Sequence, residues 1–403
     1  MRAFAVFVAC CLLWPLTGFA QAPDPFTSAR VHIGPFAVNP TLAVTGVGVD
    51  TNVFNDWTNP RSDFTATVAP AADTWLRLGR ARLNVKTAVS YLYFAKYASQ
   101  RGLGTDDRAR LQFDLIHVRP WAAASYMTTF DRPGFEIDAR VRHFEHGVSG
   151  GVDVPVSPRT TLGAAWGRAV IRYQAGESYY GYSLQEYLNR TTTTATGSLR
   201  YALTPLTTLV VAAESVRERF EYSDLRDSNG FRLVPGLEFD ASALVSGSAH
   251  VGYRHLRMLA PGMPGYNGVV ASVDLGYVLM GITRFAAQVN RDVEYSYDPT
   301  RPFYVLTGVS GSVSQSVGGP WSVTARGGIQ RLDYAGQVDA GLPGPADVTG
   351  RVDVIHTYGA GIGYKLGPST RLGVNADYYT RSADVTTLQY RGLRVGTSIT
   401  YGF

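Results

Sequence analysis

The residues that could carry chemistry are few, and they do not converge on a reaction site. His143 and His146 are three residues apart. Side chains alternate between the two faces of a strand, so these two rings point to opposite sides and cannot share a metal ion. Asp50 and Asn52 resemble the start of a calcium loop, but the Gly and Glu that such a loop requires further along are missing. We interpret them as turn residues at the end of a strand.

The glycine-rich segment 359–363 has the composition of a nucleotide-binding loop. It lies inside a strand pattern with no helix after it, so the context needed for phosphate binding is missing. We expect a track of small residues on one face of a strand instead. No Ser-centred nucleophile elbow and no paired-carboxylate site stands out. We therefore predict no enzyme activity, no metal site and no cofactor.

Composition narrows the fold class. Of the 403 residues, 17% are charged, below the roughly 25% of an ordinary soluble domain. No run of about 18 apolar residues follows residue 20, which excludes a helical membrane protein. The 43 Gly and 24 Tyr favour turns and strands over helices. The two cysteines, Cys10 and Cys11, lie in the N-terminal apolar segment, and the net charge of +5 is too small to indicate nucleic-acid binding.

Apolar and polar side chains alternate from Val38 to Phe403, in segments of about 10 to 16 residues. In the segment that begins at Ala81, for example, Arg82 and Lys86 share the polar face. Eight short turns and nine longer, more polar connections separate the segments, which predicts eighteen strands, with sixteen as the alternative. The short turns are expected near Gly79, Pro120, Pro158, Pro205, Gly247, Gly281, Gly319 and Gly367.

A soluble sandwich or propeller and a membrane barrel could both use such hairpins. The polar faces here contain Gly, Ser, Thr, Asn and Arg rather than the Lys and Glu of an outer protein surface. The segments also exceed the ~5–6 residues of soluble strands and reach the ~9–11 that a tilted membrane strand needs. Backbone groups in lipid must all be paired, so the hairpins have to close. We predict an all-β, closed antiparallel transmembrane barrel with short periplasmic turns and longer extracellular loops.

Aromatic residues gather near the predicted strand ends, as in an interfacial girdle. The girdle at the short turns is expected to contain Trp75, Trp121, Trp166, Tyr201, Tyr277, Trp321, Tyr364 and Tyr401.

Charge is the chemistry that the polar faces offer. The candidate lumen-facing residues are Arg82, Lys86, Arg108, Arg110, Arg200, Arg284, Arg326, Arg371, Arg394, Asp114, Asp274 and Asp377. They form either a polar conduit with a weak preference for anions or a self-neutralising network that stiffens the wall. Arg217, Arg219 and Arg291 do not fit the alternation. We expect them at the outer rim, facing lipopolysaccharide phosphates.

The N-terminal region has the pattern of a secretory signal. Arg2 is followed by an apolar run to Leu16 and then by small residues. Cleavage after Ala20 is favoured over cleavage after Ala22, and a lipoprotein signal at Cys10 is disfavoured because the apolar run continues beyond it. The predicted organisation is a signal peptide at 1–20, a short periplasmic segment at 21–37 and the barrel at 38–403.

The final strand resembles the terminal strand of bacterial outer-membrane barrels, in which a Gly, spaced hydrophobic residues and a last Phe are read by the barrel-assembly machinery. The matching residues are Gly396, Ile399, Tyr401 and Phe403. In addition, segments 36–42, 47–54 and 63–70 resemble the first hairpin of the putative beta-barrel porin-2 family of Gram-negative bacteria. That family includes outer-membrane proteins encoded with exopolysaccharide export systems. Val49 stands where Tyr is frequent in the family.

The resemblance implies a location in the outer membrane of a Gram-negative bacterium. The leading hypothesis is a porin-like conduit for polar solutes or polysaccharide, with a link to exopolysaccharide export. The alternative is a non-conducting structural or surface-binding barrel, and an outer-membrane hydrolase ranks third. Expected partners are outer-membrane lipid, lipopolysaccharide, the barrel-assembly machinery and a polysaccharide, without nucleic acid.

Overall fold

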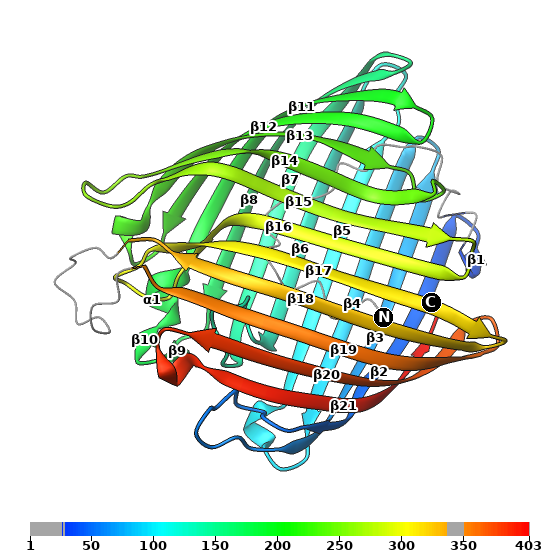
Figure 1. Cartoon of the computed structure of the whole chain (residues 1–403). Helices are drawn as coiled ribbons and strands as arrows, with labels where there is room; N and C mark the ends of the chain where they lie inside the picture. The colour runs from blue at the N-terminus through cyan, green and yellow to red at the C-terminus, as the bar shows by residue number, and fades with distance from the viewer. Residues whose placement is uncertain (1–25, 27–28, 337–349, 403) are drawn as a thin grey trace.

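The computed structural model describes residue 26 and residues 29–336 and 350–402. The predicted signal peptide, Phe403 and most of the 335–350 loop lie outside these residues. One sheet contains nineteen strands, of which the short β1 (Val31–Ile33) pairs with the start of the next strand and the other eighteen form the barrel wall (Figure 1). The first long strand pairs with both the second and the last, so the sheet closes on itself. This confirms the predicted count of eighteen strands.

All neighbouring barrel strands are antiparallel and follow the chain order around the barrel. The strands are β2 (Phe36–Asp50), β3 (Asp63–Leu78), β4 (Ala81–Phe94), β5 (Gly102–Phe113), β6 (Arg119–Asp131), β7 (Val141–Ser157), β8 (Thr160–Tyr173), β11 (Arg190–Thr204), β12 (Thr207–Phe220), β13 (Ser228–Phe239), β14 (Val245–Met258), β15 (Tyr266–Leu279), β16 (Thr283–Tyr295), β17 (Phe303–Gly318), β18 (Trp321–Tyr334), β19 (Val352–Leu366), β20 (Thr370–Ala383) and β21 (Tyr390–Tyr401).

The two ends of the barrel differ in their connections. Short turns lie at the end that holds β1 and the last residues of β21, which we call the turn end (Figure 1). The opposite loop end carries longer connections with small elements of their own. These are η1 (Ala98–Gln100), β9 (Ser178–Tyr179), β10 (Tyr182–Ser183), α1 (Leu184–Leu188), η2 (Asp224–Arg226) and η3 (Thr386–Leu388). No helix in the described part of the chain is long and apolar enough to cross a membrane.

Most predicted turns lie within two residues of a turn in the structure, and the prediction at Gly247 was wrong. Pro120 belongs to β6, because the chain turns earlier, at 114–118. Gly247 belongs to β14, after a turn at 240–244. Its φ of 111° fits a glycine, and a Cβ there would meet the carbonyl oxygen of Asp274. This glycine therefore serves close strand packing and not a turn.

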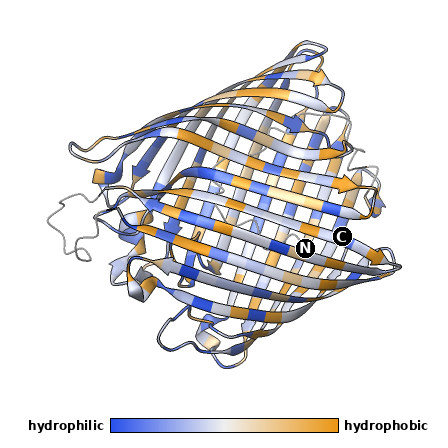
Figure 2. Cartoon of the chain, viewed as in Figure 1, coloured by the Kyte–Doolittle hydropathy of each residue, from blue (hydrophilic) through white to orange (hydrophobic). Residues whose placement is uncertain are grey.

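The two faces of the wall have opposite character, as the alternating colours along the strands in Figure 2 show. Large apolar side chains such as Leu103, Val148 and Ile362 are exposed on the outer face, which fits a surface that contacts lipid. Arg82 and Lys86 lie on the inner face, together with the residues that they face in the ladder or bind in ion pairs. Alternation fixes the direction of the remaining side chains.

The girdle prediction was wrong for two of its residues. Trp75 pairs across the ladder with Asn84, and Trp121 pairs with Gln112, both on the inner face. Trp121 is buried beneath the guanidinium of Arg110, 4.1 Å from the ring centroid. Both rings lie near the turn end, as the sequence position predicted. They are at alternate positions of their strands that point into the barrel, so they cannot belong to a girdle on the outer surface.

β15 and β16 separate from each other toward the loop end. Their ladder stops at the pair Ala271 and Arg291, although β15 stays paired with β14 and β16 with β17 beyond that level. Above the break, Val293 and Tyr295 of β16 are buried in an apolar cluster with residues from β12 and β14. The β16–β17 hairpin therefore leans into the barrel.

Candidate functional site: the lumen and its outer mouth

The lumen has a polar section toward the turn end and a closed mouth at the loop end. Alternation places all the predicted lumen-facing residues of the strands on the inner face, and Asp114 lies in the turn beside Arg82. Most of the basic residues are paired with carboxylates. The ion pairs are Arg82–Asp114 at 2.5 Å, Lys86–Asp73 at 3.5 Å, Arg108–Asp106 at 2.8 Å, Arg326–Asp377 at 2.5 Å, Arg394–Asp50 at 2.9 Å and Arg200–Glu238.

The Arg326–Asp377 pair explains the glycine track at 359–363. Arg326 on β18 and Asp377 on β20 lie on either side of Gly359, which pairs with both in the ladders. The guanidinium donates two hydrogen bonds to the carboxylate, at 2.7 and 2.6 Å. A Cβ on residue 359 would come within 2.5 Å of atoms of both side chains. The glycine lets an ion pair bridge two strands across a third one.

Arg110, Arg284 and Arg371 form no ion pair with any other described residue. Arg110 stacks on Trp121, Arg284 is exposed, and Arg371 donates a hydrogen bond to the Ser322 hydroxyl at 2.8 Å. Arg284 and Arg371 lie near hydroxyl-rich strands, where Thr324 donates to Ser314 at 3.1 Å. Asp274 receives only a 3.5 Å hydrogen bond from Gln288. The sequence allowed either a conduit with a weak preference for anions or a self-neutralising network of charges. Most of the charged residues on the inner wall form such a network, whereas Arg110, Arg284 and Arg371 keep positive charge that no described carboxylate neutralises.

An apolar cluster closes the mouth. Four connections contribute to it, at 132–140, 174–189, 296–302 and 384–389, and residues 296–302 are all buried. Its buried members are Ile137, Val141, Ile171, Tyr173, Tyr179, Leu184, Leu188, Phe220, Leu256, Met258, Val293, Tyr295, Tyr297, Phe303, Val305, Ala383 and Leu388. These side chains come from both walls and from the loops between them, so the cluster spans the lumen. We call this cluster the plug.

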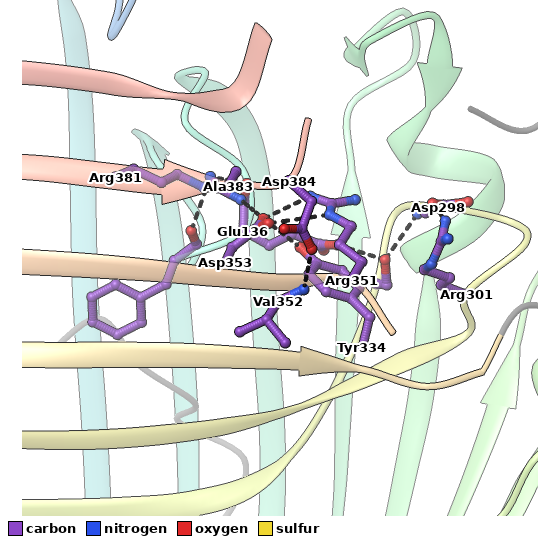
Figure 3. Close-up of polar contacts among 12 residues, drawn as sticks. Glu136, Asp298, Arg301, Tyr334, Arg351, Val352, Asp353, Arg381, Ala383 and Asp384 are labelled. Carbon is purple, nitrogen blue, oxygen red and sulfur yellow. Dashed lines mark hydrogen bonds and ion pairs between the residues drawn. The ribbon is translucent and has the colours of Figure 1, made fainter. Parts of the chain in front are cut away.

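Buried charges hold the plug to the wall (Figure 3). Arg381 on β20 donates to the backbone carbonyls of Phe135 and Glu136, at 3.4 and 3.0 Å, and pairs with the carboxylate of Asp138. Its second amino group donates to Asp353 at 2.6 Å. Arg351 donates to the same carboxylate at 2.7 Å and stacks on Tyr334. The loop from β6 to β7 is thereby bound to β20, which lies six strands away around the barrel.

Glu136 joins two of the inward-folded connections. The Ser296 hydroxyl donates to one carboxylate oxygen at 2.5 Å, and the backbone N–H of Tyr297 donates to the other at 3.1 Å. Burial raises the pKa of Glu136 to about 7, although these hydrogen bonds and the nearby Arg351 and Arg381 act in the opposite direction. The carboxyl group of this loop therefore titrates near neutral pH.

Arg226 in η2 anchors the connection at 296–302 from the other side. Its guanidinium donates to the carbonyls of Ser296 and Asp298, the latter at 2.6 Å, and to that of Tyr187 at 3.1 Å. Burial lowers the pKa of Arg226 to about 10. A buried arginine satisfied by carbonyl oxygens of several loops fixes their mutual positions.

Asp50 and Asn52 are buried at the seam between the first and last strands. Asp50 accepts hydrogen bonds from the Asn52 N–H at 3.0 Å, the Tyr379 hydroxyl at 2.8 Å and Arg394 at 2.9 Å. This agrees with a strand-end turn. His143 faces inward and stacks on Tyr173, while His146 faces outward beside Phe144. Within the described ranges no cluster of His, Cys, Asp and Glu could hold a metal ion.

Sequence reasoning missed the plug. Glu136, Asp298, Arg226, Arg351 and Arg381 lie in or next to the predicted loops, where charged residues are ordinarily solvated. The one signal was the density of Tyr and Leu in loop positions, such as Tyr179, Leu184 and Tyr297. Loops that expose such residues to water are unfavourable, and burying them requires a surface to fold against.

Among solved structures, the chain is similar to the outer membrane protein OpdK from Pseudomonas aeruginosa, with 10% identity, a TM-score of 0.48, and coverage of 90% of this chain and 98% of that one. It is also similar to a BenF-like porin from Pseudomonas fluorescens Pf-5, with 11% identity, a TM-score of 0.48 and coverage of 92% and 100%.

No curated protein matches the chain. The family description "Putative beta-barrel porin 2" matches residues 189–403, which is more than half of the sequence. The match covers the second part of the barrel, from β11 to the last strand, and the eighteen strands extend the same hairpin pattern over the first part. The chain belongs to the putative beta-barrel porin 2 family.

Proposed function

We propose that the protein is an outer-membrane channel for polar solutes, with a weak preference for anions, whose outer mouth is closed by a removable plug. The observation that carries this proposal is the contrast between the two parts of the lumen. The turn-end section is lined by Ser, Thr, Gly and charged residues, which suit a watery passage. At the mouth, connections between strands fold inward and pack against side chains of the wall and of the inward-leaning β16–β17 hairpin.

A removable plug is consistent with the way its parts are held. The connections at 132–140 and 296–302 are joined to each other and to the wall by side-chain hydrogen bonds and ion pairs of Glu136, Arg226 and Arg381. No covalent link between these groups is needed, so opening requires exchange of those contacts for water and separation of the apolar side chains of the plug. An eighteen-strand wall is wide enough for an aqueous channel once the loops leave it.

The second candidate is a non-conducting structural barrel, and the same plug favours it. Apolar packing of this extent stabilises a closed state, and a barrel that never opens would display its loops for binding at the cell surface. The two candidates differ in one property, which is whether ions can cross when the plug is loosened.

Planar-bilayer conductance tests the proposal. The purified protein should insert with low or intermittent current, and deletion of residues 178–187, which removes β9, β10 and most of α1, should produce steady conductance. A deletion of the exposed residues 57–61, which contribute no side chain to the plug, controls for general loop shortening. Correctly folded barrels of the 178–187 deletion that still carry no current would favour the non-conducting candidate.

The finer expectations belong to the same proposal. A polysaccharide cargo and a role in exopolysaccharide export are supported by the resemblance of the first hairpin, and the aromatic mouth offers rings on which sugars could stack. Liposome swelling with neutral and acidic oligosaccharides tests the cargo: uptake by open-mouth vesicles is expected, and exclusion of all sugars would contradict it. We also propose that the barrel contacts outer-membrane lipid and is inserted by the barrel-assembly machinery. We propose no enzyme activity for it.

A further inference from the structure

The outer face of the barrel carries charge at the loop end alone. On the strand halves next to the turns, the described outward residues are uncharged. On the halves next to the loops they include nine arginines and two aspartates. These are Arg142, Arg168, Arg172, Arg217, Arg219, Arg257, Arg291, Arg331, Arg391, Asp107 and Asp333. The outer face is therefore strongly cationic at one rim.

Three of these arginines stand in one row across neighbouring strands. Arg168 on β8 pairs with Thr193 on β11, which pairs with Arg217 on β12. Arg217 pairs with Asn229 on β13, which pairs with Arg257 on β14. Strands are ~4.8 Å apart, so successive arginines in the row are about 10 Å apart. The polar Thr and Asn between them add hydrogen-bonding groups, and all three arginines are exposed.

The charges of the row are not neutralised by the protein. Arg168, Arg217 and Arg257 form no ion pair with another described residue. By contrast, Arg172 and Arg219, which lie four and two residues closer to the loops on β8 and β12, pair with Glu221 and Asp227. Guanidinium groups on a lipid-facing surface are costly without an anionic partner. The partner must therefore come from the surroundings of the barrel.

The height of the row identifies where that partner lies. With ~3.3 Å per residue and a tilt near 40°, Arg168 lies about 20 Å and Arg257 about 30 Å above the turn ends of their strands. The apolar band of an outer-membrane barrel is about 25 Å tall. The row thus crosses from the upper edge of the apolar band into the headgroup level of the outer leaflet.

We propose that this arginine row, Arg168, Arg217 and Arg257 with Thr193 and Asn229, is a binding site for the phosphate groups of a phosphorylated glycolipid of the outer leaflet. Arginine binds phosphate with paired, charge-assisted hydrogen bonds. Apolar neighbours on the same strands, such as Phe231 and Val251, are exposed below the row and provide a surface for acyl chains. The site rests on the membrane location of the barrel and not on whether the lumen conducts.

Titration of the purified, folded barrel in detergent tests the site. The probe is lipid A bisphosphate dispersed in the same detergent, and binding is measured by calorimetry. The triple variant Arg168→Gln, Arg217→Gln, Arg257→Gln should bind lipid A at least about tenfold more weakly, because each arginine adds a charge-assisted hydrogen bond to phosphate and so strengthens binding. The matched control, Arg110→Gln, Arg284→Gln, Arg371→Gln, removes the same charge from the inner face and should bind like the unaltered protein. Heat-modifiable migration in gels verifies folding of each variant.

Further arms separate the possible partners. Dephosphorylated lipid A should bind at least about tenfold more weakly, and salt should weaken the bisphosphate interaction. Inorganic phosphate should not compete at millimolar concentration, because a lipid site also needs the acyl surface. Equal affinity of the triple variant and the unaltered barrel would overturn the proposal. So would conversion of an oligomer to a monomer by the triple variant with unchanged lipid binding, which would make the row an interface between copies.

Discussion

The guanidinium of Arg381, on β20, donates a 3.0 Å hydrogen bond to the backbone carbonyl of Glu136, which lies 245 residues earlier in the loop between β6 and β7. The β6–β7 loop and β20 lie six strands apart around the barrel, so the bond links the loop to a distant strand of the wall. The same arginine holds Asp353 on the neighbouring strand at 2.6 Å. Arg381 therefore joins the β6–β7 loop, β19 and β20.

Replacing Arg381 should loosen the mouth. Arg381→Ala removes the partner of two carboxylates and leaves buried carbonyl groups without a donor, with an expected loss of about 3 kcal/mol in unfolding free energy. Single-channel recordings should show longer open times. Urea unfolding in detergent and conductance measure the two effects. Arg331→Ala is the control, because its ion pair with Asp333 is exposed and should contribute less than about 0.5 kcal/mol. Identical behaviour of the two variants would contradict the assigned role.

Closure should depend on pH through Glu136. Its pKa is about 7 in the closed mouth, above the ordinary value of 4.5, so the closed state binds more protons than an open, solvated loop between these values. Acid therefore favours closure, and raising the pH from about 4.5 to 7 should weaken closure by up to about 3 kcal/mol. Open probability should increase over this range and level off above it. Glu136→Gln should abolish that dependence, and a variant that keeps it would show that another group is responsible.

Ion selectivity should follow the unpaired arginines of the turn-end section. Arg284→Gln combined with Arg371→Gln removes two positive charges that no carboxylate neutralises, so the reversal potential in a KCl gradient should shift toward cation preference. Arg326→Gln is an instructive comparison, since it leaves Asp377 without its partner but changes the lumen charge by one unit instead of two, and should produce a smaller shift in the same direction. Unchanged reversal potentials in the double variant would assign selectivity to another part of the lumen.

Assembly should depend on the last strand. Phe403 lies outside the described residues, but β21 ends at Tyr401, which pairs with Thr370 on β20 and with Leu42 on β2. Deleting Phe403 removes the final residue of the proposed assembly signal, and less folded protein should reach the outer membrane in cells. Refolding of the purified chain into detergent should be unaffected. The amount of folded barrel in membrane fractions is measured for the unaltered protein and for the deletion variant. Equal amounts would contradict a role of Phe403 in the assembly signal.

The wall of the barrel could be predicted from the sequence because its rule is local. Each strand must present apolar residues to lipid and small or polar residues to the lumen, so a period of two is visible in segments such as 81–94. The same parity indicated that His143 and His146 face opposite sides and that Arg217, Arg219 and Arg291 break the pattern. The predictions were wrong where one residue type could serve two structural purposes. Gly247 marked close packing instead of a turn, and Trp75 and Trp121 were assigned by height without regard to parity.

The sequence by itself determined the strand count, the two faces and the closing of the sheet, because lipid imposes one condition on every residue of the wall. Only the tertiary structure decided that the mouth is closed and that Arg168, Arg217 and Arg257 share a row. Loop conformation depends on contacts between residues such as Glu136 and Ser296, which are 160 positions apart. The row depends on the register of five neighbouring strands. Both are set by the closed sheet, whose geometry brings distant segments together in a way that no single segment encodes.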